Sequence, residues 1–257
     1  MSSFSYLSAE DANAIVPSSC KTLCLFATYQ PREEDFVCED NVKYASSLAA
    51  AFDTVVLLTN VRDQNITRHE SLPHNVVIVP LENLCFDFGM WFRFLYHFDT
   101  SLLTRLGLVN DSCILLRAKD LEEVIQKTNA PFWGMTDSHE CNVHHLQSYF
   151  LMFEGGGIQQ LKKFIKESDI ASYVDKTKSH IVGGFELGLS QYMSKHMPLH
   201  AVYPYTNLFH IPSKWGTFAH NPAHGMWDRL LIDGMPILKK GRMHFEDEER
   251  FIATFTK

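Results

Sequence analysis

Thr54–Asn60 reads TVVLLTN, an uninterrupted run of β-branched and aliphatic residues that ends in polar ones. Three further runs have the same character: Thr22–Tyr29 (TLCLFATY), Asn75–Pro80 (NVVIVP) and Arg105–Asp111 (RLGLVND). Runs that are apolar throughout are typical of strands buried on both faces, as in a parallel sheet covered by helices. Residues 44–52 and 86–103 lie between these runs and show a helical pattern. The alternation over about 20–115 therefore predicts an α/β fold with a Rossmann-like, mostly parallel sheet.

The region after this alternation, about 116–242, is less regular and is rich in histidine. The elements expected there are helices at 120–127, 158–167, 185–196 and 223–232, and strands at 131–137 and 147–153. The segment from Gly241 onward is charged and is expected to lie at the periphery. Because no repeat, low-complexity segment or Pro/Ser-rich linker separates the two regions, we predict a single domain over 1–257.

The composition excludes several classes of protein. Hydrophobic residues make up 46% and charged residues 21%, as in a globular protein and unlike a disordered chain or a coiled coil. The net charge of −7 makes nucleic acid a poor partner, since non-specific binding depends on cationic neutralisation of phosphate. The six scattered cysteines predict free thiols in a reducing compartment. With no signal peptide and no transmembrane run in the sequence, we expect a cytoplasmic protein.

Polar side chains stand where the expected strands end. Thr28 and Tyr29 end the first strand, Asn60 ends the second, and Asn110 and Asp111 end the fourth. Ligands bind in the crevice at the carboxyl ends of parallel strands, so we expect these residues to contact a cofactor. A hard divalent cation there would take oxygen from Asp111, together with phosphate oxygens and water. The alternative is that Asp111 only caps the next segment of the chain.

Asn83–Arg93 (NLCFDFGMWFR) contains an Asp-Phe-Gly tripeptide like that of protein kinases. The kinase catalytic loop and Gly-rich loop are absent from the sequence, which excludes that class. Gly89, among acidic and aromatic residues, suggests a close approach of the backbone to a ligand, with Asp87 and Arg93 as cofactor contacts. The alternative is a buried aromatic helix start with Asp87 as its cap.

Two later segments offer carboxylates. Phe132–Ser138 (FWGMTDS) is an expected strand that presents Asp137 near its end, before a loop with three histidines. Paired His144 and His145 suit a metal, although surface histidines without a metal are commoner. Gly183-Gly184 suggests a hinge that places Glu186 in the first turn of a helix, where the helix N–H groups would stabilise its carboxylate as a proton acceptor. The alternative is a helix-terminal Glu without further meaning.

The last candidates lie near the end of the chain. His220 and His224 are four residues apart, which is the spacing of a metal pair on one helix face. The alternative is a helix that starts at Pro222 with incidental histidines. Three basic residues after this segment suit a diphosphate, or form an ordinary solvated run: Lys239, Lys240 and Arg242.

Together and in this order, these segments resemble the rhamnan synthesis protein F family of glycosyltransferases, which includes enzymes of bacterial polysaccharide assembly and of large algal viruses. The resemblance runs over about 22–242. Its motifs are Phe86–Trp91, Asn110–Ser112, Phe132–Gly134, Thr136–Ser138, His145–Phe150, Glu186, Leu189-Ser190, Asn221-Pro222, Trp227-Asp228, Pro236 and Lys239. The sequence departs from the family at Cys113–Leu116, where the family usually has Gly-Pro.

The resemblance implies a GT-A fold, with a nucleotide-sugar half at about 20–115 and an acceptor half at about 116–242. It implies a UDP-, dTDP- or GDP-sugar donor, Mn²⁺ or Mg²⁺, a growing glycan as acceptor, and the host cytoplasm if the chain is viral. The transferred sugar would be rhamnose, xylose or a similar sugar. The Asp-x-Asp of GT-A enzymes is reduced here to Asn110-Asp111, so the expected metal ligands are Asp111 and His224.

The implied reaction is an inverting displacement in which a carboxylate takes the proton of the acceptor hydroxyl. Glu186 is the preferred base and Asp137 the second candidate, while Lys239 or Arg242 would stabilise the leaving diphosphate. Two other functions stay open at this point. One is a catalytically inactive carbohydrate-binding module. The other is a nucleotide-sugar hydrolase or pyrophosphorylase, although Thr28–Pro31 is not the Gly-rich, Lys-bearing loop of the latter.

Overall fold

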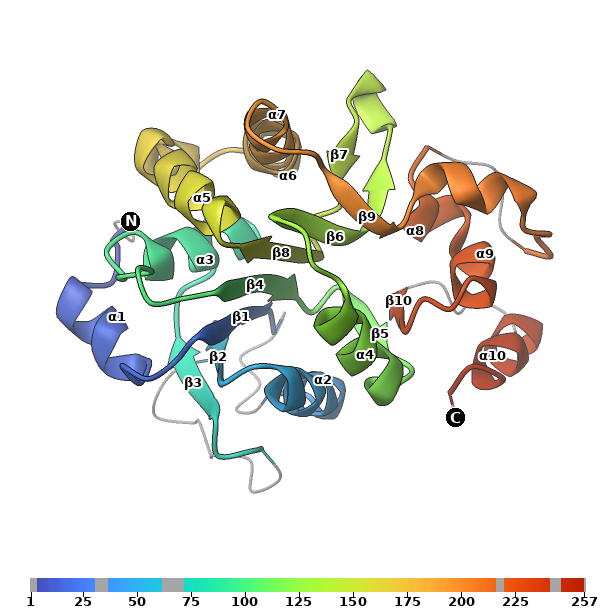
Figure 1. Cartoon of the computed structure of the whole chain (residues 1–257), viewed down its shortest axis with the longest axis horizontal. Coiled ribbons are helices and arrows are strands. Elements are labelled where there is room, and N and C mark those ends of the chain that lie inside the picture. The colour runs from blue at the N-terminus through green and yellow to red at the C-terminus, as the bar shows by residue number, and fades with distance from the viewer. Residues whose placement is uncertain (1–3, 31–36, 62–71, 216–219, 241–245, 257) are drawn as a thin grey trace.

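The central sheet has the strand order β3-β2-β1-β4-β8-β6-β7, with β9 beside β6 (Figure 1). The structure is a computed structural model that describes residues 4–30, 37–61, 72–215, 220–240 and 246–256. The first four strands in the chain are parallel to one another: β1 (Thr22–Thr28), β2 (Thr54–Thr59), β3 (Val76–Pro80) and β4 (Arg105–Asn110). The predicted α/β fold with its parallel sheet is confirmed, because these strands fall on the four apolar runs.

Helices cover both faces of this sheet, which explains why the strands lack alternation. Leu23 and Leu25 of β1 pack in one hydrophobic cluster with α1 (Ala9–Ile15), α3 (Phe86–Leu95) and α5 (Gly156–Glu167). Cys24 and Phe26 pack in a second cluster with α2 (Glu39–Ala51) and α4 (Ala118–Lys127). Consecutive side chains of a strand point to opposite faces, so each strand must be apolar at every position.

The second half of the chain completes the same sheet with antiparallel strands. β8 (Phe150–Glu154) pairs with both β4 and β6 (Phe132–Ser138). β7 (His145–Leu146) folds back on the end of β6 as a hairpin, which projects from the sheet in Figure 1. β9 (His200–Tyr203) adds a parallel partner to β6.

A small second sheet joins distant parts of the chain. β5 (Cys113–Leu115), which directly follows β4, pairs antiparallel with β10 (Ile237–Lys239). Lys239 is the partner of Cys113 in this pairing. The pairing therefore places a basic residue from the end of the chain beside the carboxyl end of β4.

The remaining helices lie mostly in the second half of the chain. They are η2 (Glu140–Asn142), η3 (Ile170–Tyr173), α6 (Lys178–Ile181), the π-helix η4 (Val182–Leu187), α7 (Gly188–Ser194), η5 (Tyr205–His210), α8 (Pro222–Gly225), α9 (Trp227–Ile232) and α10 (Glu246–Ala253). Within the described ranges, no helix combines the length and apolar character needed to cross a bilayer. All six cysteines are unpaired, as predicted.

Several expected boundaries were wrong. The helix expected at 86–103 ends at Leu95, and the strand expected at 147–153 is β8, which starts later, at Phe150, and is preceded by the separate strand β7. The helix expected at 185–196 starts earlier, at Lys178, and includes a π-helical segment. The helix expected at 223–232 is divided between α8 and α9, and the short strands β5, β9 and β10 were not anticipated. Short strands carry too few residues for a readable pattern.

Two adjacent glycines at the start of α5 provide a test of the packing. A Cβ on Gly157 would lie 1.8 Å from the carbonyl oxygen of Pro131, whereas a Cβ on Gly156 would meet nothing within 4 Å. Gly157→Ala should therefore lower the free energy of unfolding by about 1–3 kcal/mol, the usual cost of overpacking. Gly156→Ala is the matched control and should change it by less than about 1 kcal/mol. Urea denaturation of both variants measures the two changes in the free energy of unfolding. Equal changes would contradict the close approach of Gly157 to the Pro131 carbonyl.

Candidate active site

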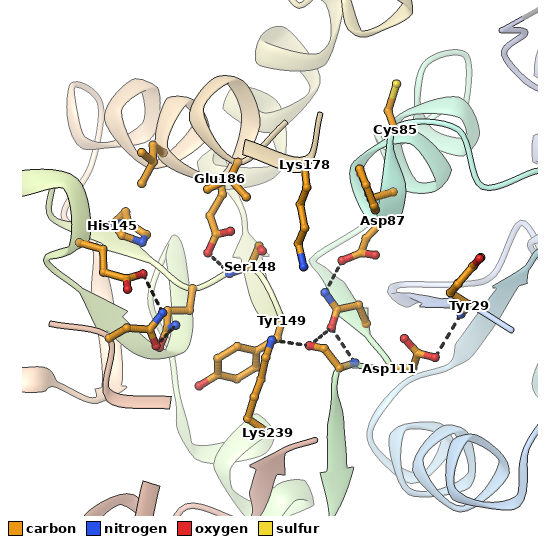
Figure 2. Close-up of a pocket in the computed structure, with 18 of the residues that line it drawn as sticks. Tyr29, Cys85, Asp87, Asp111, His145, Ser148, Tyr149, Lys178, Glu186 and Lys239 are labelled. Carbon is orange, nitrogen blue, oxygen red and sulfur yellow. Dashed lines mark hydrogen bonds between the residues drawn. The ribbon is translucent and has the colours of Figure 1, made fainter. Parts of the chain in front are cut away.

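A cavity of about 750 Å³ opens at the carboxyl ends of β1 and β4 (Figure 2). One wall comes from the start of α3, the segment after β4, and β10. The opposite wall comes from α6, the π-helix and the connection between β7 and β8. The cavity thus lies at the edge of the sheet where a parallel α/β fold binds ligands.

A chain of hydrogen bonds organises the first wall (Figure 2). The side-chain amide of Asn110 donates to the carboxylate of Asp87. Ser112 donates to Asn110 Oδ1 from its backbone N at 3.0 Å and from its hydroxyl at 2.5 Å. Lys239 Nζ donates to the Ser112 hydroxyl at 2.9 Å. The end of β4, the first turn of α3 and β10 are therefore tied together around one polar network.

Asp111 adds a second carboxylate to this wall. Its Oδ2 accepts hydrogen bonds from the backbone N of Tyr29 at 3.1 Å and from Asn41 Nδ2 at 3.2 Å. Lys240 Nζ lies 4.0 Å from the same oxygen. These contacts join the ends of β1 and β4, the helix α2 and the segment after β10. Tyr29 and Asp111 both line the cavity.

The two carboxylates of this wall influence each other. Burial, and to a lesser extent the negative charge of Asp111, raise the pKa of Asp87 to about 6, against the opposing effects of Asn110 and Lys239. A cation between the carboxylates would favour their ionised forms. Asp87 and Asp111 supply the hard oxygen ligands that Mg²⁺ or Mn²⁺ accepts along with substrate phosphates and water. This wall therefore offers carboxylate oxygens of the kind that a divalent cation accepts.

The backbone before α3 explains how Asp87 reaches the cavity. Cys85 and Phe86 have φ values of 60° and 56°, in the left-handed region that non-glycine residues rarely adopt. The turn brings the Leu84 carbonyl oxygen to within 1.6 Å of the position that a Cβ on Gly89 would occupy. The expectation that Gly89 approaches a ligand was therefore wrong, because the close neighbour is the chain itself. Asp87 is also not the helix cap, since Cys85 holds that position.

Three residues expected to contact a cofactor do not line the cavity. Thr28 is buried and its hydroxyl donates to the carbonyl of Leu58 at 3.2 Å. Asn60 exchanges two hydrogen bonds with the backbone of Gln30, at 2.8 and 2.9 Å. Arg93 is buried and donates to the carbonyls of Ser5 and Glu82, at 2.6 and 2.8 Å. All three side chains therefore bond to the backbone of the protein itself.

Glu186 lines the opposite wall, but its local structure differs from the expectation. It lies inside the π-helix of a continuous helical segment that starts at Lys178, so the predicted hinge and helix start at Gly183-Gly184 were wrong. Its Oε1 accepts a hydrogen bond from the backbone N of Ser148 at 3.1 Å. Figure 2 shows Glu186 across the cavity from Asp87. π-Helical segments are rare and occur frequently at functional sites.

The sequence reasoning missed Lys178. It is the first residue of α6, and its side chain points into the cavity between Asp87 and Glu186 (Figure 2). A single lysine in an irregular segment belongs to no motif, so no sequence signal marks it. With Lys239 on the facing wall, it provides positive charge for an anionic ligand in a chain of net negative charge.

A buried network of amides also borders the cavity. Gln147 Nε2 donates to Asn221 Oδ1 at 2.7 Å, and Asn221 Nδ2 donates to Glu140 at 2.8 Å. The hydroxyl of Thr136 donates to Gln147 Oε1 at 2.7 Å and lies 2.6 Å from the hydroxyl of Tyr149. Gln147, Tyr149 and Asn221 belong to the motifs of the resemblance, although none was assigned a role.

Asp137 does not join Glu186 at the cavity. Its Oδ1 accepts from the backbone N of Tyr205 at 2.6 Å, and its Oδ2 lies 2.9 Å from His144 Nε2. Thr136 contacts the cavity-lining Gln147, and neighbouring residues of a strand point to opposite faces. Asp137 therefore lies on the other face of β6.

The histidines expected as metal ligands are separated. His224 is exposed on α8 and lines the cavity together with Asp111. His220 precedes that helix, so the expected pair on one helix face was wrong. Among the described residues, the group of three metal-type ligands is Asp137, His139 and His144, outside the cavity lining. Arg242 lies outside the described residues.

Comparison by sequence returned no match to a protein-family model and no match to a curated protein. Comparison of folds gave several similar solved structures. One is 4-diphosphocytidyl-2C-methyl-D-erythritol synthase from Anaerococcus prevotii, with a TM-score of 0.44 and 12% identity over 71% of this chain and 86% of that one.

Two glycosyltransferases are also similar in fold. The glycosyltransferase GlyE of Streptococcus pneumoniae has a TM-score of 0.41 and 12% identity over 74% of this chain, and the match spans 46% of its own length. The galactosyltransferase LgtC, solved with donor and acceptor sugar analogs, has a TM-score of 0.34 and 12% identity over 65% of this chain and 71% of that one. These TM-scores are too low to indicate which reaction the chain catalyses, so only the residues of its own cavity can indicate it.

The titration of Asp87 tests the electrostatics of the cavity. The carboxyl carbon of Asp87 should titrate near pH 6 in NMR spectra of the folded protein, above its ordinary value of 3.8. The native state then holds a proton that the unfolded chain has released, so this group makes stability fall as pH rises from about 4 to about 6. Asp111→Asn should lower the Asp87 midpoint, because it removes a negative charge. Lys239→Met should raise it, and shifts of the same sign in both variants would contradict the arrangement.

Proposed function

We propose that this protein is a glycosyltransferase that moves a sugar from a nucleotide-sugar donor to a hydroxyl group of a growing glycan. The observation that supports it best is the division of charge between the two walls of the cavity. One wall carries the carboxylates of Asp87 and Asp111 beside Lys239, at the carboxyl ends of parallel strands. The other wall carries Glu186, oriented by the backbone of Ser148.

The first wall suits the diphosphate of a nucleotide sugar. Asp111 and Asp87, with His224 as a further ligand, would hold Mn²⁺ or Mg²⁺ together with phosphate oxygens. The cation, when bound, supplies positive charge to the leaving diphosphate. Lys239 and Lys178 face the same space from opposite sides and add charge-assisted hydrogen bonds to phosphate.

The second wall suits proton transfer from the acceptor. Glu186 takes the proton of the acceptor hydroxyl while that oxygen bonds to the anomeric carbon. The bond from the anomeric carbon to the diphosphate breaks, and its electron pair leaves with the diphosphate. Attack from the side opposite the leaving group inverts the anomeric centre. The hydrogen bond from Ser148 N to Glu186 Oε1 leaves Oε2 for the substrate.

The resemblance to the rhamnan synthesis family supports rhamnose, xylose or a similar sugar, carried by UDP, dTDP or GDP. The unpaired cysteines support a reducing, cytoplasmic location. Incubation with a panel of nucleotide sugars, with and without Mn²⁺ and acceptor glycans, tests the function. Transfer that requires an acceptor supports the proposal. Sugar release without an acceptor indicates a hydrolase, and donor binding without turnover indicates an inactive binding module.

Removal of the proposed base should affect turnover and not donor binding. Glu186→Gln keeps the size of the side chain and an acceptor oxygen for Ser148 N, but it cannot take a proton. Turnover should fall by about 10²–10⁴-fold with the donor Kd within about twofold, since general-base catalysis contributes on that scale. Glu167→Gln is the control, because Glu167 is exposed at the end of α5. Loss of turnover in Asp137→Asn but not in Glu186→Gln would identify Asp137, and not Glu186, as the base that takes the acceptor proton.

Removal of one carboxylate of the other wall should affect donor binding. Asp111→Asn keeps an oxygen that can accept from Tyr29 and Asn41, but it loses the charge that attracts a cation. Donor affinity in Mn²⁺, measured by calorimetry, should fall at least about tenfold, which corresponds to ~1.4 kcal/mol. In EDTA the variant and the parent protein should bind donor equally weakly. Unchanged affinity in Mn²⁺ would contradict the metal assignment, and full transfer in EDTA would place diphosphate stabilisation on the lysines alone.

A further inference from the structure

The hairpin of β6 and β7 carries a group of side chains that the proposed reaction does not use. One ligand atom from each of Asp137, His139 and His144 lies within 4.8 Å of the other two. Asp137 Oδ2 and His144 Nε2 are 2.9 Å apart, and the rings of His139 and His144 stack at 4.8 Å with an angle of 16° between their planes. None of the three lines the cavity.

We propose that these three residues form a binding site for a divalent ion of the zinc class, separate from the donor cavity. Two imidazoles and one carboxylate are a donor set that Zn²⁺ and its neighbours in the periodic table accept, whereas Mg²⁺ and Mn²⁺ favour oxygen ligands. The distances between the donor atoms suit an ion at their centre, with small movements of the side chains. Three protein ligands leave a position for water, and the exposure of His144 makes the site accessible.

The surroundings hold the ligands in place. Oδ1 of Asp137 accepts from Tyr205 N, so the carboxylate is fixed through the oxygen that would not bind the ion. The backbone N of His139 donates to the carbonyl of His220 at 3.0 Å, and the ring of Tyr205 lies 5.3 Å from the ring of His139. Hydrogen bonds of this kind around a metal site orient its ligands and raise affinity.

The ligands also span the hairpin. Asp137 pairs with Leu146 one residue before the end of β6, His139 lies just beyond that strand, and His144 directly precedes β7. Glu140 and Cys141, between the two histidines, line the cavity. A bound ion would therefore join both arms of the hairpin to η5 and fix the part of the cavity wall that these residues form. Ion binding would thus restrain this wall of the cavity, an effect referred to below as the clamp. Binding of the ion at this site does not depend on the proposed function.

Zinc binding by untagged protein tests the site. The protein is stripped with EDTA, dialysed into buffer with excess Mg²⁺ to fill the oxygen-ligand site, and titrated with ZnCl₂ by calorimetry. The parent protein should bind one tight equivalent, and Co²⁺ should give a visible absorption band of histidine-ligated metal. His144→Gln and His139→Gln should each weaken Zn²⁺ binding at least about tenfold. The control His200→Gln removes another exposed histidine, on β9, and should bind as the parent does.

A second measurement separates the ion site from the clamp. Amide hydrogen exchange over 139–145 should slow when Zn²⁺ is added to the parent protein and should not change in His144→Gln. His144 is exposed, so thermal denaturation of this variant in EDTA should match that of the parent and show that it is folded. Equal Zn²⁺ affinity in His144→Gln and His200→Gln would overturn the site. Tight binding without slower exchange would overturn the clamp.

Discussion

The hydrogen bond from the Asn110 amide to the Asp87 carboxylate joins the end of β4 to the first turn of α3. The rest of the candidate site is arranged around it. Asn110 also accepts from Ser112, which receives the bond from Lys239, and Asp111 follows Asn110 to meet Tyr29 after β1. A partly buried carboxylate needs such donors, because burial without them raises its pKa and removes its charge. The network keeps negative charge at the point where a parallel sheet binds its ligands.

Contacts between distant parts of the chain supply the remaining groups. Lys239 reaches the cavity because β10 pairs with β5, and Glu186 reaches it because the helical segment from Lys178 packs across from the sheet. Neither position follows from local sequence. The end of β4 and the start of α3 thus carry the acidic wall, with Lys239 added from β10, and the segment from Lys178 carries the facing groups.

The sequence predicted the parallel strands well, because burial on both faces makes each of them apolar throughout. It placed Asp111, Asp87, Lys239 and Glu186 among the site residues, and all of them line the cavity. The prediction from sequence failed where neighbouring residues do not determine the direction in which a side chain points. Arg93 has the charge for an anion but is turned toward backbone carbonyls. Asp137 is close in sequence to residues that line the cavity, yet the alternation of side chains along β6 points it to the other face. Lys178 belongs to no sequence motif.

The π-helix at Val182–Leu187 gives this wall an unusual sensitivity to changes in chain length. A π-helical turn closes its hydrogen bonds one residue later than an α-helical turn does, so the segment accommodates an extra residue without breaking the helix. Loss of that residue in a descendant would restore the regular α-helix. Because the wide turn had absorbed that residue, the helix on either side would keep its orientation, and only the residues inside the segment would change their spacing. Lys178, which precedes the segment, would keep its position, whereas Glu186, which lies inside it, would shift relative to the cavity.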